Sequence, residues 1–163
     1  MRRPIVAGNW KMIGGLVSVD ELVKGILHGL ATRPVKVCEV WLFPAYVHLI
    51  NVVNLVEGVD IAVGSQDLDI RSGGSVTGAV SAQMIRDTGC EVFLCGHSER
   101  RTHFGETNEI IAEKFEVGLA AGLTPILCVG ESQAERNAGN TLAVVSSQLD
   151  AVVDHVGVAC LLY

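Results

Sequence analysis

The sequence predicts an α/β fold built from repeated strand–helix units whose strands run parallel. Short apolar runs rich in Val and Ile recur along the chain, and each is followed by a stretch in which apolar residues have helical spacing. The runs are apolar on both faces, which is typical of parallel strands covered by helices rather than of an antiparallel sandwich. The predicted strands are residues 5–10, 36–43, 59–65, 91–96 and 124–129.

The helix after the first strand has the clearest pattern. Ser18 and Glu21 fit a capping box, in which the first side chain caps the helix and the second reaches back to it. The apolar residues that follow share one face of the predicted helix: Val19, Leu22, Ile26, Leu27 and Leu30. This helix is therefore expected to lie on the sheet.

The helix after the fourth strand follows the same logic. Ile111, Phe115 and Leu119 are spaced four apart and form its apolar face. The charged residues between them are expected to face water: Glu109, Glu113, Lys114 and Glu116.

Two architectures satisfy this pattern, an open doubly wound sheet and a (β/α)₈ barrel. We find five units, whereas a closed barrel takes eight strands and about 250 residues. No G-x-G-x-x-G follows a strand and no G-x-x-x-x-G-K-[ST] occurs, so neither of the common phosphate cradles of open sheets can be assigned. No linker or second domain is visible, and residues 1–163 are expected to form a single incomplete domain.

Composition excludes several classes of protein. The 163 residues are 49% hydrophobic with a net charge of −6, and the sequence pI is about 5.3, so broad attraction to nucleic acid or to an anionic membrane is not expected. The five cysteines form no C-x-x-C pair, which suits free thiols in a reducing compartment. Without a signal peptide or an apolar span of transmembrane length, a soluble cytoplasmic protein is predicted.

Polar side chains gather just after the strands, where parallel α/β proteins build their sites. They are Asn9 and Lys11, Gln66 and Asp67, His97 to Glu99, and Glu131. Because Asn9 and Lys11 are two apart, both are expected to point to one side of an extended segment. An amide, a flexible cation and an imidazole then converge on one space.

His97 is open to three interpretations. Cys95, His97 and Glu99 alternate as potential metal ligands, but no second histidine has ligand spacing. A buried, hydrogen-bonded histidine is the structural default at a strand end. The third interpretation is an electrophile: at the N-terminus of a helix capped by Ser98, the helix dipole favours the neutral imidazole, which can donate a hydrogen bond to a substrate oxygen.

A serine hydrolase is a further interpretation of this segment. Gly96-His97-Ser98 matches the opening of the G-x-S-x-G elbow, and Asp150 and His155 follow in the right order. Arg100 argues against it, because the elbow needs a small residue two places after the serine.

Four segments resemble the triosephosphate isomerase family, in the right order and at the right separations. They are VAGNWKM (6–12), VGSQDLDIRSGGSVTG (63–78), CGHSERRTHFGETNE (95–109) and GLTPILCVGES (122–132). The resemblance covers residues 1 to about 150 and implies the N-terminal portion, about five βα units, of a (β/α)₈ TIM barrel. It also implies a cytosolic homodimeric isomerase of glycolysis and gluconeogenesis, which interconverts dihydroxyacetone phosphate and glyceraldehyde 3-phosphate without cofactor or metal.

The resemblance also implies roles for individual residues. Asn9 and Lys11 would contact substrate, and His97 would polarise its carbonyl and move protons between its two oxygens. Glu99 would hold Lys11 in position. Two further pairs are implied: Ser98 and Cys128 support the site, and Thr77 and Gly78 lie in a loop that enters the partner subunit.

The sequence departs from the family pattern in one decisive place. The general base of the family, a glutamate after the sixth strand, has no counterpart before Tyr163, and neither do the phosphate-binding turns that follow it. The chain alone is therefore expected to be inactive or nearly so, and a non-catalytic binding or assembly partner is the alternative. Smaller departures are Ile13, Asp67, in place of the usual Asn, and Ala79, in place of the usual Glu.

Overall fold

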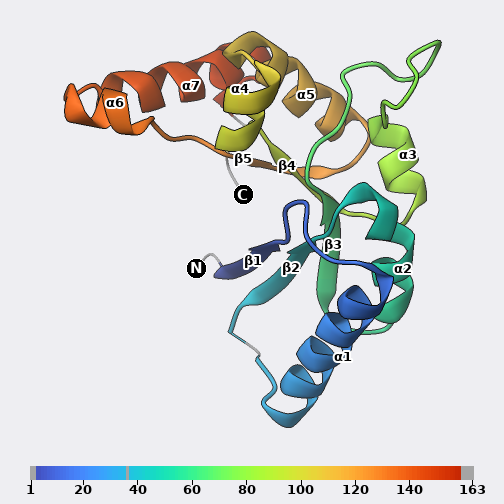
Figure 1. The fold of residues 1–163 in the computed structure, drawn as a ribbon. Coiled ribbons are helices and arrows are strands. Elements are labelled where there is room, and N and C mark those ends of the chain that lie inside the picture. Colours follow the sequence, from blue (N-terminus) through green and yellow to red (C-terminus); the bar gives the residue numbers. More distant parts are fainter. Residues whose placement is uncertain (1–2, 36, 159–163) are drawn as a thin grey trace.

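Five parallel strands form one sheet in the computed structural model, which describes residues 3–35 and 37–158 (Figure 1). Each strand lies beside the strand that precedes it in the sequence, giving the order β1-β2-β3-β4-β5. The strands are β1 (Ile5–Asn9), β2 (Glu39–Phe43), β3 (Ile61–Ser65), β4 (Val92–Cys95) and β5 (Thr124–Leu127). All five predicted strands are thereby confirmed.

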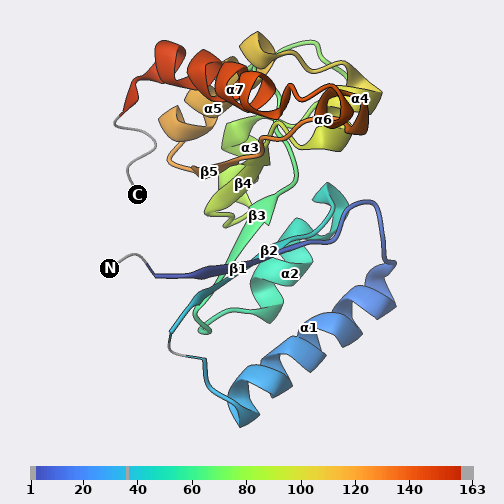
Figure 2. The ribbon, with the colours of Figure 1, turned by 90° about the vertical axis from the view of Figure 1, so that its left-hand side faces the viewer.

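The sheet order decides between the two architectures that the sequence left open. A doubly wound sheet places its first strand in the interior, because the chain reverses direction across the sheet. Here the chain progresses one way only, the sheet curls, and the helices lie on its outer side (Figures 1 and 2). The predicted partial (β/α)₈ barrel is confirmed.

The helices connect the strands in chain order. The longer ones are α1 (Leu16–Thr32), α5 (Asn108–Ala120) and α7 (Thr141–Val156). Shorter segments are the 3₁₀ turn η1 (Tyr46–His48) and the helices α2 (Leu49–Leu55), α3 (Ala82–Asp87), α4 (Ser98–Phe104) and α6 (Gln133–Asn137). No helix in the described part of the chain is long and apolar enough to cross a membrane.

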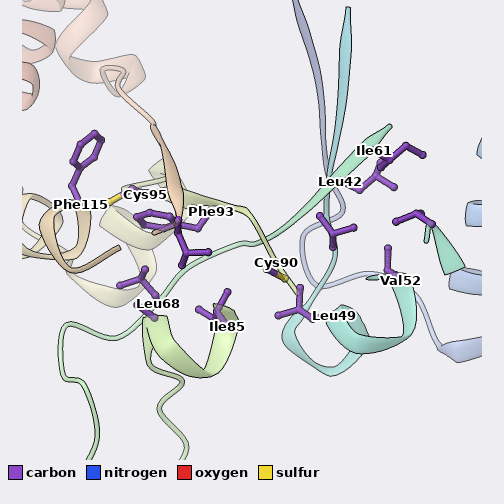
Figure 3. Close-up of a cluster of buried hydrophobic side chains, with 14 of the residues drawn as sticks. Leu42, Leu49, Val52, Ile61, Leu68, Ile85, Cys90, Phe93, Cys95 and Phe115 are labelled. Carbon is purple, nitrogen blue, oxygen red and sulfur yellow. The ribbon is translucent and has the colours of Figure 1, made fainter. Parts of the chain in front are cut away.

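The main core lies between the sheet and these helices (Figure 3). Phe93 of β4 and Phe115 of α5 are buried in it, together with Leu68, which follows β3. Gly118 allows the close contact with α5, because a Cβ there would lie 2.3 Å from the ring of Phe93. A second cluster covers the concave side of the sheet and contains Trp41, Phe43, Val92 and Leu94.

The start of α1 corrects one prediction. Ser18 is not the N-cap: Gly15 holds that position, and the Ser18 hydroxyl accepts from Gly15 N–H at 3.1 Å and donates to its carbonyl oxygen at 3.0 Å. The helix thus begins earlier than expected, and Ser18 is its third residue. Val19 and Val23 are buried, whereas the predicted face residue Leu22 is exposed.

Lys114 corrects a second prediction. The other charged residues expected on the outer face of α5 are exposed, but Lys114 is only 6% exposed. Its ammonium donates to Asp67 Oδ1 and to Glu106 Oε1, both at 2.6 Å. Two carboxylates from other parts of the chain therefore stabilise a lysine that helical spacing assigns to water. Leu119, assigned to the apolar face, is exposed.

The four cysteines that the structure describes are free thiols, two of them buried, and Cys160 lies outside the described residues. The loop between β3 and α3, which contains Thr77 and Gly78, extends away from the sheet (Figure 1). Both residues are exposed, and Gly78 has φ +87°, a left-handed conformation that glycine adopts without strain.

Candidate active site

Residues that are distant in the sequence meet at the edge of the sheet where the strands end. The Lys11 ammonium donates to Glu99 Oε1 at 2.7 Å, and Glu99 Oε2 lies 3.4 Å from His97 Nδ1. Lys11 follows β1, whereas His97 and Glu99 follow β4. The glutamate therefore joins the predicted cation to the predicted electrophile.

The backbone of Lys11 is held in an unusual conformation. Its φ of +54° is left-handed, which is strained for a residue with a side chain. Lys11 N–H donates to Asn9 Oδ1 at 2.9 Å, and the Gln66 amide donates to the carbonyl oxygens of Lys11 and Phe43, each at 2.8 Å. The prediction of an extended segment was wrong: the chain turns after Asn9, and the asparagine holds the turn.

Gln66 is a site residue whose role sequence analysis missed. It was recognised as a polar residue after the third strand, but no function was assigned to it. Its amide bridges the end of β2 to the Lys11 turn, and it therefore supports the position of the lysine. The only available signal was its place after a buried strand, which is too general to name a partner.

His97 itself is the N-cap of α4. Its Nδ1 accepts from Glu99 N–H at 3.3 Å, and Ser98 is the first residue of the helix rather than its cap. The prediction for Ser98 was wrong, because the cap position falls one residue earlier, at His97. A ring that accepts at Nδ1 carries its proton on Nε2 when neutral, which makes Nε2–H a hydrogen-bond donor.

The Lys11–Glu99 pair is open to solvent. The two side chains are 51% and 45% exposed. The hydrogen bond from Lys11 lowers the pKa of Glu99, so the glutamate is an anion at neutral pH. Exposed ion pairs contribute little to stability, and this one places a cation at the site rather than stabilising the fold.

A cavity of about 170 Å³ adjoins His97. It is lined by Gly96, His97, Ser98, Arg101 and Cys128, and by Val129 and Gly130. Cys128 N–H donates to the Cys95 carbonyl oxygen at 2.8 Å, which continues the pairing of β4 and β5 past the end of β5. Burial raises the pKa of the Cys128 thiol, so this side chain is neutral.

The remaining polar residues of the rim do not join this site. Glu131 binds Arg136 at 2.7 Å, and Asp67 binds Lys114 and Arg100. Each of these carboxylates already has a cationic partner. Neither is therefore placed as a free base beside His97.

The two competing interpretations also fail to assemble. Cys95 Sγ donates to the Ile111 carbonyl oxygen at 3.4 Å and lies in the core, and no group of potential metal ligands is found among the described residues. His155 pairs with Glu116 at 2.9 Å. In residues 3–35 and 37–158, no hydrogen bond connects Ser98 to His155 or to Asp150, so a hydrolase triad is not formed.

A sequence model of the family described as triosephosphate isomerase matches residues 4–161, nearly the whole chain. The chain belongs to the triosephosphate isomerase family. Proteins named triosephosphate isomerase from Ectopseudomonas mendocina and Roseiflexus castenholzii are 46% and 47% identical to it, over 99% and 94% of this chain. A third, from Photorhabdus laumondii, is 42% identical over 98% of the chain.

These relatives of the triosephosphate isomerase family are longer than this chain. The matched regions cover 63%, 59% and 62% of their lengths. The chain thus spans about 60% of the length of the curated relatives it matches. The site described above lies entirely within the shared region.

Proposed function

We propose that this protein provides the electrophilic half of a triosephosphate isomerase site, which interconverts dihydroxyacetone phosphate and D-glyceraldehyde 3-phosphate by way of an enediolate. The observation that carries the proposal is that Glu99 contacts both groups: its carboxylate accepts from the Lys11 ammonium, and its backbone N–H donates to His97 Nδ1. Family membership supports the choice of substrate, a small phosphorylated triose.

Each residue has a role that its geometry suits. The neutral imidazole of His97 donates from Nε2 to the substrate carbonyl and passes a proton between the two oxygens of the enediolate. Lys11 offsets the charge of the phosphate and of the developing oxyanion, and Asn9 contacts substrate beside it. Glu99 and Gln66 position Lys11, while Ser98 and Cys128 border the adjoining cavity. The proposal assigns no step to a cofactor or a metal.

The reaction also requires a base that removes a proton from carbon. The carboxylate that contacts His97 belongs to Glu99, which is bound by Lys11. We infer that none of residues 3–35 and 37–158 acts as the base, and that the chain alone is nearly inactive. A positioned base contributes about 10²- to 10⁴-fold in rate, or roughly 3 to 5 kcal/mol.

A homodimer completes the proposal. Thr77 and Gly78 lie exposed in the long loop after β3, and we propose that this loop enters a partner subunit. Exposed apolar residues also lie in the loop after β1 and in η1, and these two segments are in contact, since His48 Nε2 lies 3.1 Å from the Gly14 carbonyl oxygen. They include Met12, Ile13 and Val47. These exposed apolar residues support an interface with a second copy of the chain. Family membership supports a cytoplasmic role in glycolysis and gluconeogenesis.

The experiment compares this chain with a version extended through the eighth strand of a relative. Isomerisation of glyceraldehyde 3-phosphate is measured for both, and binding of dihydroxyacetone phosphate to each is measured by calorimetry. We expect turnover by the extended form only. Turnover by the short chain would refute the missing base, and an extended form that folds but neither binds nor turns over triose phosphate would refute the function.

One observation favours a second candidate, a non-catalytic assembly partner. Among the described residues β1 pairs only with β2, and its residues Ile5 and Val6 are 42% and 59% exposed. An open apolar edge can pair with another chain. A chain that associates stoichiometrically with a partner but shows no affinity for triose phosphate would favour this candidate.

A further inference from the structure

Arg101, in the second turn of α4, folds its guanidinium back toward the start of its own helix. Its Nε donates to the Gly96 carbonyl oxygen at 3.0 Å. Gly96 immediately precedes His97, and its φ of +72° is left-handed. The carbonyl that Arg101 holds thus belongs to the peptide group that joins Gly96 to His97.

The contact between Arg101 and Gly96 is close. A Cβ on Gly96 would lie 3.2 Å from Arg101 Nη2 and 2.9 Å from two side-chain carbons of Ile111. Only glycine leaves room for the guanidinium on one side and the buried isoleucine on the other. The peptide before His97 is therefore packed as well as hydrogen-bonded.

The same guanidinium reaches two further helices. Arg101 Nη1 donates to Asn108 Oδ1 at 2.6 Å, and Asn108 is the first residue of α5. Asn108 Nδ2 in turn donates to Ser147 Oγ of α7 at 3.3 Å. The peptide that leads into His97 is thus tied through Arg101 to α5 and α7, whose mutual packing is extensive.

A contribution to stability does not by itself explain why an arginine is partly buried at position 101. It makes no ion pair in the part of the chain that the structure describes, and its Nη2 is buried without a hydrogen-bond partner. Burial is the main effect on this group and lowers its pKa. A partly buried cation held only by neutral oxygens costs desolvation energy that such bonds repay incompletely. The neighbouring Arg100, by contrast, binds two carboxylates.

We propose that Arg101 is a positioning residue for His97. The imidazole is constrained from both sides of the chain: Glu99 N–H fixes Nδ1, and Arg101 fixes the preceding peptide. Together these two hydrogen bonds fix the direction in which Nε2–H points. The inference rests on the proposed function, because it matters only if Nε2–H meets a substrate carbonyl.

The test uses three variants of the full chain with graded losses. Arg101→Met removes the charge and all of its hydrogen bonds, and Arg101→Lys keeps the charge but loses the planar geometry of the guanidinium. Asn108→Ala keeps Arg101 but removes its partner on α5, together with the bond from that partner to Ser147 of α7. Arg86→Lys is the matched control, since Arg86 of α3 likewise donates to a backbone carbonyl oxygen, that of Cys90, at 3.0 Å. Thermal melts identify any variant that fails to fold.

Two measurements report on His97 itself. Nitrogen-15 spectra of the imidazole give its tautomer, and calorimetry gives the affinities for dihydroxyacetone phosphate and for inorganic phosphate, which has no carbonyl. We expect Arg101→Lys to populate both tautomers of the imidazole. The affinity for dihydroxyacetone phosphate should fall about two- to tenfold, which is the contribution of one hydrogen bond. The phosphate affinity should not change, and Asn108→Ala should show a smaller effect in the same direction.

Other results would overturn the proposal. A folded Arg101→Lys protein with the wild-type tautomer and wild-type affinities shows that Arg101 does not position His97. Equal weakening of both ligands shows a general structural effect instead. The proposed function is refuted only through the extended form described above; if the wild-type chain itself binds no triose phosphate, the tautomer spectra of Arg101→Lys and Asn108→Ala decide whether Arg101 orients the ring.

Discussion

Two clusters of polar side chains each include a residue of α4. Their ion pairs have similar lengths, but the side chains differ in exposure to solvent. The site cluster consists of Lys11, His97 and Glu99, and its ion pair measures 2.7 Å. The buried cluster consists of Asp67, Arg100, Glu106 and Lys114, and its pairs to Lys114 measure 2.6 Å. Glu99 of the site cluster and Arg100 of the buried cluster are successive residues of α4.

Exposure separates the two clusters. The side chains of Lys11 and Glu99 are about half exposed, whereas those of Lys114 and Glu106 are 7% and 5% exposed. In water an ion pair can open at little cost, which leaves Lys11 available to a substrate. In the buried cluster, loss of one partner leaves another charge without compensation.

The buried cluster also carries a cost of its own. Burial raises the pKa of Asp67 although Lys114 acts in the opposite direction, so keeping this carboxylate charged is unfavourable. Two acids and two bases balance, and the cluster ties the end of β3 to α4 and α5. Ion pairs of similar length thus lie in different surroundings: one cluster is buried within the fold, and the other is open to solvent at the candidate site.

The largest effect is expected from Lys114→Met. Removing this ammonium leaves Asp67 and Glu106 buried against Arg100 alone, which should lower the free energy of unfolding by about 3 to 5 kcal/mol. Urea denaturation measures it, with Lys24→Met on the exposed side of α1 as control. Replacing Asp67 by Asn in the same chain should recover part of the loss. A loss no larger than that of the control would remove the distinction between the clusters.

A smaller loss is expected from Gln66→Ala. The carbonyl oxygens of Lys11 and Phe43 lose their donor, which should cost about 1 to 3 kcal/mol of unfolding free energy. The Lys11 turn should also relax, and amide shifts of Lys11 in NMR spectra report this. Gln83→Ala is the control, because that amide binds only Asp87 within α3. Unchanged Lys11 shifts in a destabilised protein would contradict the positioning role of Gln66.

Glu99→Gln should separate stability from site geometry. Because the pair is exposed, the urea midpoint is expected to stay within error of the wild type. The Lys11 ammonium should nonetheless lose its fixed place, and triose phosphate affinity should fall. A clear drop in the midpoint would show that the site cluster also stabilises the fold.

The smallest effect concerns the exposed pair of Asp69 and Arg71 in the long loop after β3. Hydrogen bonds from Arg71 lower the pKa of Asp69 to about 2, below its ordinary 3.8. Since the folded value is the lower one, the pair stabilises the chain above about pH 4, and this contribution is lost as the pH falls toward 2. Carboxyl shifts of Asp69 during acid titration measure it. In Arg71→Met the titration should move back toward the ordinary value, and an unmoved titration would contradict the assignment.

Much of the fold could be predicted because its signals are local. Apolar runs located all five strands, and helical spacing located the buried face of α5 at Ile111 and Phe115. At the start of α4 the local signal was wrong by one residue. Ser98 is typical of a cap, yet His97 holds that position and its imidazole accepts from the Glu99 amide.

The site was predicted in part. Motifs and family resemblance singled out Lys11, His97 and Glu99, which the fold brings together. The contributions of Gln66 and Arg101 were not foreseen. The contacts that carry these roles are to the backbone carbonyls of Lys11, Phe43 and Gly96, and the identity of a residue does not indicate whether its carbonyl will accept such a bond.

The amino-acid sequence by itself determined the alternation of strands and helices and the family to which the chain belongs, because both depend on patterns within short segments. Tertiary structure alone decided which charges are buried. Lys114 meets Asp67 across 47 residues of sequence, and nothing near either residue distinguishes it from a lysine or an aspartate in water. Burial depends on what the rest of the chain brings alongside, and only the folded sheet specifies that.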